Sequence, residues 1–302
     1  MDVKSFMKMF NGVKLVKINR AKIAAIVIIF LFLRGSLFDF IVKWKSLLQS
    51  WRYYGILCHY SLENDALPSA ESNDFSPSNK SIFFLETSCR RSLTSRDLCA
   101  IESAARTHPD YQTIVLFSAP ISEEIFEHIS LYQKFDNIRF ARIHIDHYSK
   151  KTPVQEFVRS GALDRSKWGV EHTSDMLRFL TLYKYGGIYL DLDVVVAKRL
   201  DNLAANWAAR ESEWTVSNGA LAFSMDSVDF EVYGPELFYP IKWQNSSKYF
   251  DSGMLENKDA YIYHVWNHMT RNRTPDKNSP YAQLARTFCP FTYALYGDRF
   301  GL

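Results

Sequence analysis

The stretch HTSDMLRFLTLYKYGGIYLDLDVVV, residues 172–196, decides the fold. Its first half predicts a helix with a broad apolar face, formed by Met176, Leu177, Phe179, Leu180 and Tyr183. Ser174 is a suitable N-cap for this helix. Gly186-Gly187 would end it, because glycine adopts the left-handed conformation that many helix C-termini need. The second half, Ile188 to Val196, is rich in β-branched and aromatic residues and predicts an extended chain.

Two acidic residues interrupt this extended segment. Asp191 and Asp193 follow the apolar strand Ile188-Tyr189-Leu190, and strand alternation would put both carboxylates on one side. Two carboxylates at such a place are costly unless a positive charge lies between them, and a hard divalent cation bound to a diphosphate would supply it. A bare D-x-D occurs by chance in many proteins, where it simply ends a strand in solvent. The preceding Gly-Gly break and the Asp175/Arg178 pair on the helix make the metal site the stronger interpretation.

The residues before this stretch alternate between short apolar runs and amphipathic segments. Strands are expected at 82–85, 113–117 and 138–145, and helices at 97–107 and 122–135. Strands separated by helices of this length predict an α/β fold with a mostly parallel sheet. In such sheets ligands bind beyond the carboxyl ends of the strands.

The composition excludes some classes of protein. The chain has 302 residues, 47% hydrophobic and 23% charged, which is ordinary for a globular protein. Its formal charge of +3 is too small to indicate nucleic-acid binding. Much of that excess lies in the first 22 residues, where a membrane-orientation signal would be found.

An apolar run, Ile23 to Leu33, follows this basic segment. It could be a signal anchor, a cleaved signal peptide or a buried helix. No polar face interrupts it, which argues against a buried helix, and no A-x-A-like site follows it, which argues against cleavage. The favoured interpretation is a signal anchor over 23–42, with Arg34 reaching the interface, a cytosolic tail over 1–22 and the remaining chain in the lumen.

Other features agree with a lumenal body. N-x-[ST] sequons occur at Asn79, Asn245 and Asn272. Residues 63–80 are rich in Ser, Asn, Asp and Pro, so 43–80 is expected to be a flexible stem and 81–302 the catalytic domain. The four cysteines lack zinc-finger spacing, which leaves free thiols or two disulfides open.

Several stretches of the chain together resemble one glycosyltransferase family. GGIYLDLD is similar to the D-x-D signature of retaining glycosyltransferases of the GT-A fold, whose Rossmann-type sheet is flanked by helices. A wider set of segments resembles the lactosylceramide α-1,4-galactosyltransferase and α-1,4-N-acetylglucosaminyltransferase family: residues 82–88 (IFFLETS), 101–109 (IESAARTHP), 174–193, 217–223 (SNGALAF), 238–250 (FYPIKWQNSSKYF), 261–267 (YIYHVWN) and 289–290. These segments cover most of residues 82–302.

The resemblance implies a type II Golgi membrane enzyme. It would transfer galactose or an N-acetylhexosamine from a UDP-sugar in α-1,4 linkage, with retention, to a glycosphingolipid-type or other glycan acceptor, using Mn²⁺ or another divalent cation. Asp193 would bind the metal directly, and Asp191 the metal and the donor. Further donor contacts are implied for Ser174, Asp175, Arg178, Gly187 and Tyr189. No residue presents itself as the catalytic nucleophile.

Weaker assignments come from the same resemblance. His264 is either a third metal ligand or a structural histidine beside Trp266. Trp243 and Trp266 could stack on acceptor sugars, but most tryptophans in such a chain belong to the core. Asn218-Gly219 matches a turn near the acceptor region. Because Cys99 and Cys289 lie in matched segments, disulfides become the expected state of the cysteines.

One departure from the family affects the functional prediction. Family members have a considerably longer stretch, including helices, where this chain has only residues 224–237 (SMDSVDFEVYGPEL). Helices that cover a sheet cannot be lost without exposing apolar surface. The alternative to an active enzyme is therefore a family member that binds UDP-sugar and metal without efficient transfer. A membrane protein with a purely structural cation is a third possibility, against which the intact helix and D-x-D residues argue.

Overall fold

The computed structural model describes residues 56–61 and 65–302. The predicted tail, the anchor and part of the predicted stem lie outside these residues. Among the described residues, no helix has the length and apolarity to cross a bilayer.

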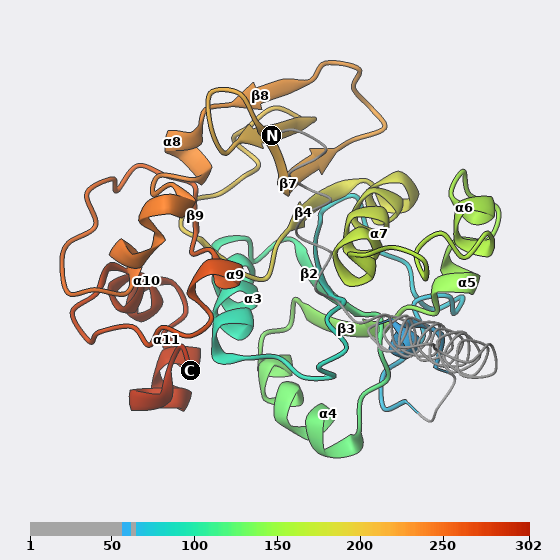
Figure 1. The fold of residues 1–302 in the computed structure, drawn as a ribbon, viewed down its shortest axis with the longest axis horizontal. Coiled ribbons are helices and arrows are strands. Elements are labelled where there is room, and N and C mark those ends of the chain that lie inside the picture. The colour runs from blue at the N-terminus through green and yellow to red at the C-terminus, as the bar shows by residue number, and fades with distance from the viewer. Residues whose placement is uncertain (1–55, 62–64) are drawn as a thin grey trace, which may run out of the picture. The chain divides into compact units, whose positions relative to one another are not determined.

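A seven-stranded mixed sheet forms the centre of the fold (Figure 1). Its strands in spatial order are β3 (Ile138–Arg142), β2 (Gln112–Phe117), β1 (Ser81–Glu86), β4 (Gly187–Leu190), β7 (Val216–Phe223), β6 (Trp207–Arg210) and β8 (Glu231–Tyr233). Neighbours from β3 to β4 run parallel, β7 is antiparallel to both β4 and β6, and β8 is parallel to β6. The predicted α/β class with a mostly parallel sheet is confirmed.

Helices lie on both faces of this sheet and around the C-terminal part of the chain. They are α3 (Ser95–Thr107), α4 (Glu123–Ser130), α5 (Ile145–Tyr148), α6 (Gln155–Arg159), α7 (Gly169–Tyr185), α8 (Pro235–Phe238), α9 (Asn267–Thr270), α10 (Pro280–Phe288) and α11 (Pro290–Tyr296). Short 3-10 turns add η1 (Leu57–Tyr60), η2 (Leu131–Lys134), η3 (Trp243–Tyr249) and η4 (Gly297–Arg299). One apolar core joins α3 to one sheet face, and a second joins α7 to the other.

A small second sheet lies beyond the D-x-D segment. β5 (Val194–Val196) leaves the main sheet and pairs antiparallel with β9 (Ile262–His264). Val195 and Tyr263 pack into a third apolar core with α10 and the disulfide that joins Cys99 to Cys289. This cystine ties α3 to the C-terminal helices, so the expectation of disulfides is confirmed.

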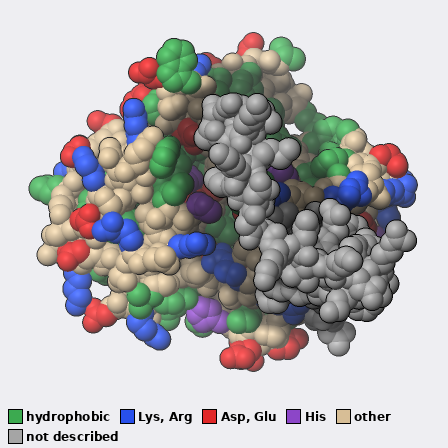
Figure 2. Space-filling model, in the orientation of Figure 1, with side chains coloured by type: hydrophobic (Ala, Val, Ile, Leu, Met, Phe, Trp, Pro, Cys, Tyr) green, Lys and Arg blue, Asp and Glu red, His purple; other side chains and the backbone are tan. Residues whose placement is uncertain are grey.

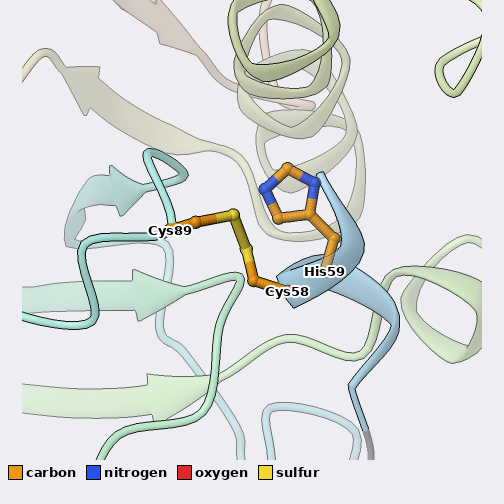
Figure 3. A group of neighbouring side chains, drawn as sticks. All are labelled: Cys58, His59 and Cys89. Carbon is orange, nitrogen blue, oxygen red and sulfur yellow. A yellow bond between two sulfur atoms is a disulfide. The ribbon is translucent and has the colours of Figure 1, made fainter. Parts of the chain in front are cut away.

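The second disulfide joins Cys58 of η1 to Cys89, in the loop after β1 (Figure 3). His59 lies beside it, with Nε2 3.0 Å from the carbonyl oxygen of Thr87, and burial lowers the pKa of this histidine. The three side chains have the grouping of a metal site. Both sulfurs, however, are bonded to each other and are not available as thiolate ligands.

Several elements differ from their predicted bounds. The helix of the deciding stretch begins at Gly169 with Trp168 as N-cap, so Ser174 lies inside it and the N-cap prediction is wrong. The strand predicted over 138–145 ends at Arg142, and α5 begins three residues later. The helix predicted over 122–135 is divided into α4 and η2.

Residues 65–80 do not form the flexible stem that their composition indicates. Leu67 and Ala70 are buried, and the backbone N–H of Ala70 donates to the Arg142 carbonyl at the edge of the sheet. Asp65 forms a 3.0 Å ion pair with the buried Arg142. The packed body therefore begins before residue 81, because this polar segment supplies the partners of a buried arginine.

Candidate active site

The two aspartates lie in the turn between β4 and β5 rather than on a strand. The parallel neighbours β1 and β4 meet where the order of the sheet reverses, which is the place where α/β sheets bind ligands. Because β9 pairs with β5, His264 is opposite Val194. Its Nε2 is 3.1 Å from Asp193 Oδ1 and 3.8 Å from Asp191 Oδ2.

These three side chains form a compact ligand set. One ligand atom from each of Asp191, Asp193 and His264 lies within 4.8 Å of the others. Two carboxylates and an imidazole suit Mn²⁺ or a similar divalent cation. The main chain fixes Asp193, since the backbone N–H of Asn267 donates to its Oδ2 over 2.8 Å.

The electrostatics of the cluster also favour a cation. Burial opposes the charging of Asp191, but Arg178 and His264 outweigh it and hold the pKa of this carboxyl below its usual value. Burial likewise opposes protonation of His264, yet the carboxylates of Asp193 and Asp191 raise its pKa to about 10. Without a metal, the imidazolium therefore supplies the positive charge that the two carboxylates require.

Arg178 holds Asp191 from the α7 side. Its Nη1 donates to Asp191 Oδ1 over 3.1 Å and to the Asn218 carbonyl over 2.8 Å, while Nη2 donates to Ser174 Oγ over 3.0 Å. The Tyr189 hydroxyl donates to the same Asp191 oxygen over 2.7 Å. The guanidinium is buried and occupied by these partners, so in this structure it positions Asp191 instead of standing free for a donor phosphate.

Asp175 is the open member of this network. Its side chain is 45% exposed, lies 3.4 Å from Arg178 and accepts a 2.8 Å hydrogen bond from Asn218 Nδ2. This leaves carboxylate surface available to a ligand. The structure thus brings together Ser174, Asp175, Arg178, Tyr189 and Asn218, which lie on three different elements.

Gly187 is not brought to this group. It begins β4, at the end opposite to Asp191, with φ +89°. A Cβ there would lie 2.5 Å from the Ser81 carbonyl oxygen. Glycine is required for the close approach of β4 to β1, and Gly187 lies at the end of β4 away from the other predicted donor residues.

Two buried residues, one at the carboxyl end of β1 and one beside His264, were not assigned to the site from the sequence. Glu86, at the carboxyl end of β1, is buried and accepts from the Ser88 backbone N–H over 3.0 Å, and burial raises its pKa. The Tyr239 ring, also buried, lies 5.2 Å from the His264 ring. Both belong to segments singled out by the family resemblance, which was the available signal.

The tryptophans are divided between core and surface. Trp266 donates from Nε1 to the Ile241 carbonyl over 2.7 Å, and its ring lies 4.4 Å from His264. Its backbone is left-handed, with φ +60°, which is uncommon for a bulky residue. Trp243, in contrast, is 46% exposed. Of these two residues, Trp266 therefore packs against His264 of the Asp191/Asp193/His264 cluster, and Trp243 keeps an exposed face.

A cavity of about 340 Å³ lies elsewhere. It is lined by Gly186, Gly187, Phe223 and Asn79, among others. These residues are at the amino end of β4 and the carboxyl end of the antiparallel β7. The cavity is therefore at the end of the sheet opposite to the carboxylates and is not their ligand site.

Gly219 sets the spacing of the cluster and gives a first prediction. A Cβ on this residue would lie 2.6 Å from Asp191 Oδ2 and 3.1 Å from the Tyr239 hydroxyl. Gly219→Ala should displace the Asp191 carboxylate and weaken Mn²⁺ binding by about 10- to 100-fold, as losses of second-layer support do. Calorimetric titration with Mn²⁺ measures this. The control is Gly253→Ala, whose Cβ would meet no atom within 4 Å; unchanged affinity in Gly219→Ala would contradict the assigned role.

Comparisons with known proteins agree with this site. Residues 94–211 match the family description "Glycosyltransferase sugar-binding region containing DXD motif", and residues 217–296 match "Alpha 1,4-glycosyltransferase conserved region". The chain belongs to this family of DXD-containing α-1,4-glycosyltransferases. The prediction of a glycosyltransferase enzyme is confirmed.

Individual relatives give the degree of similarity. The lactosylceramide 4-alpha-galactosyltransferase of Mus musculus is 28% identical over 299 residues, covering 80% of this chain and 81% of the mouse protein. The alpha-1,4-N-acetylglucosaminyltransferase of Homo sapiens is 24% identical, covering 79% of this chain and 89% of its own. Among solved structures, the PaToxG glycosyltransferase is 17% identical with a TM-score of 0.38, covering 75% of this chain and 77% of its own.

Proposed function

We propose that this chain transfers galactose or an N-acetylhexosamine from a UDP-sugar, in α-1,4 linkage and with retention, to a glycan carried by a glycosphingolipid or a similar acceptor. The observation that carries the proposal is the convergence of Asp191, Asp193 and His264 at the point where the order of the sheet reverses. Relatives of two donor specificities, one a galactosyltransferase and one an N-acetylglucosaminyltransferase, leave both donor sugars as candidates.

We assign different roles in donor binding to different side chains of the site. Asp191, Asp193 and His264 would hold Mn²⁺ or another divalent cation, which neutralises the charge that develops on a leaving diphosphate. Arg178 and Tyr189 keep the Asp191 carboxylate ionised and in place. Asp175, half exposed beside them, is the group that we assign to a hydroxyl of the donor.

The competing function is a family member that binds the donor without efficient transfer. The observation in its favour is the apolar surface around the short segment 224–237. Met225 is 74% exposed, Val228 99% and Phe230 47%. A purely structural cation is less well supported, since Asp175 and Asp191 remain accessible at the ligand-binding edge.

A donor panel separates these functions. Release of UDP from UDP-galactose, UDP-N-acetylglucosamine and UDP-N-acetylgalactosamine is measured with Mn²⁺ and a lactose-type acceptor, alongside UDP binding. An active enzyme releases UDP from one donor in an acceptor-dependent way. Binding without release supports the alternative, and neither binding nor release from the folded protein would refute both.

We further propose that the chain is a single-pass type II Golgi protein anchored by residues 23–42, with the described body in the lumen. Carbonate extraction should leave it in the membrane, and glycosidase treatment should shift its mass through glycans on Asn79, Asn245 or Asn272. All three asparagines are exposed. A soluble product that begins after Ser36, or a body without glycans, would contradict this topology.

A further inference from the structure

The outward side of α7 is unusually aromatic. Trp168, His172, Phe179 and Tyr183 follow the spacing of one stripe along this helix, and we call these four residues the α7 stripe. Trp168 is 53% exposed, Phe179 48% and Tyr183 55%. The solvent face of an amphipathic helix normally carries charged and polar residues. The broad apolar face predicted for this helix is thus only partly buried.

The neighbouring strands continue this apolar surface. One residue from each of β4, β7, β6 and β8 lies opposite the next, so the four share one face of the sheet: Tyr189, Leu221, Ala208 and Val232. The first three pack in the same core as the buried side of α7. Val232 is 40% exposed. Since α7 contacts β1, β4 and β7, the β6–β8 end of this face lacks an equivalent cover among the described elements.

Figure 2 shows hydrophobic side chains gathered over α7, with lysine and arginine side chains of the α6 region beside them. Lys150, Lys151, Arg165 and Lys167 are exposed there, together with the acidic Glu156 and Glu171. Lys167 lies 5.0 Å from the centroid of the Trp168 ring. Exposed Trp and Tyr next to lysine are characteristic of surfaces at the membrane–water interface.

The point where the chain enters the body gives an independent argument. Ile56 is buried against the start of α7, where a Cβ on Gly169 would lie 2.9 Å from Ile56 Cγ2. Ile56 is 14 residues beyond residue 42, the end of the proposed anchor. A fully extended connection of that length spans at most about 50 Å. With the proposed anchor in the membrane, the chain would therefore reach the body at the start of α7.

We propose that the α7 stripe rests on the surface of the lipid bilayer. Arg178 and Ser174 face the active site from another side of α7, and Asp175 lies at the edge of the stripe, so docking would hold that site beside the headgroups of membrane glycolipids. The suggested purpose of this surface, delivery of a lipid-bound acceptor, depends on the proposed function. Its existence can be tested without any transfer reaction.

The first test uses the full chain reconstituted in phosphatidylcholine vesicles. All four cysteines are in disulfides, so a single introduced cysteine can be spin-labelled selectively. Labels are placed at Tyr183→Cys and, as a matched control, at Leu131→Cys on η2, which is 46% exposed and is not part of the surface. Collision with a water-soluble nickel complex should be severalfold slower at position 183 than at 131. Equal collision rates would overturn the proposal, and so would spin–spin broadening at 183, which would show a second copy of the chain on this surface.

The second test separates docking from chemistry. Phe179→Ser/Tyr183→Ser should raise the apparent KM for a glycolipid acceptor in vesicles by about tenfold, with kcat and transfer to a water-soluble lactoside unchanged. A matched Leu131→Ser variant should change neither the apparent KM for the glycolipid acceptor nor the transfer to the lactoside. An equal loss with both acceptors would overturn the docking role. If the unaltered chain transfers to neither acceptor, the proposed function fails, while the label at 183 still decides whether the surface docks.

Discussion

Asp193→Ala should lower acceptor-dependent release of UDP by about a thousandfold or more, because the metal site supplies several kcal/mol of charge stabilisation to the leaving diphosphate. The Asp193 carboxylate lies 3.1 Å from His264 Nε2 and accepts from the Asn267 N–H, so its removal opens the cluster and frees the imidazole. Asp191→Ala should be comparably severe. Initial rates over a series of Mn²⁺ concentrations measure the effect.

Two controls separate chemistry from folding in this prediction. Asp193→Asn retains a hydrogen-bond acceptor for Asn267 but loses the charge, so it should melt like the unaltered chain and be nearly as inactive. Asp251→Ala removes an exposed aspartate paired with Arg273 and should leave the rate unchanged. Near-normal UDP release by a folded Asp193→Ala protein would remove Asp193 from the metal site.

The second large effect concerns the short segment 224–237. Inserting a family-length stretch after Phe223 should raise transfer to the acceptor by roughly 10- to 100-fold, the cost that a misplaced acceptor imposes, without changing UDP affinity. The expectation rests on what surrounds the segment. Phe230 and Val232 are half exposed on a sheet face, and β8, the strand that the segment forms, has only three residues.

The relatives support the same expectation. The match to the mouse galactosyltransferase extends over 299 residues but covers only 80% of this 302-residue chain. The mouse protein therefore has residues inside the matched region that have no counterpart here. The donor side, with Asp175, Arg178 and both aspartates, precedes the short segment and should bind UDP in either form. Equal transfer by the inserted and original chains would make the missing stretch dispensable.

The parts of the site that are close in sequence could be predicted from it. The Gly-Gly break, the apolar strand and the two aspartates lie within eight residues, 186–193. Local rules for strands and helix ends place the helix end and the strand correctly, although the aspartates follow the strand in a turn. The start of α7 could not be placed, because Ser174 is a good N-cap by type while the helix begins five residues earlier, where Gly169 packs against Ile56. Long-range packing outweighs the capping preference.

Long-range packing explains why the position of His264 and the exposure of two α7 residues could not be predicted from local sequence. His264 reaches Asp191 and Asp193 only because β9 pairs with β5 across about 70 residues of sequence, a pairing that no periodicity indicates. Family resemblance suggested His264, but no local pattern did. In the same way, helical spacing predicts that Phe179 and Tyr183 are core residues. Both remain half exposed, which depends on how α7 packs on the sheet.

A Mn²⁺ titration with saturating UDP present, followed by the electron paramagnetic resonance signal of the free ion, tests directly whether Asp191, Asp193 and His264 bind a metal. We expect one bound Mn²⁺ per chain, UDP affinity that falls when the metal is chelated, and loss of both in Asp193→Asn. UDP binding that is indifferent to Mn²⁺, or a Mn²⁺ site that persists in Asp193→Asn, would contradict the assignment of Asp191, Asp193 and His264 as the metal site.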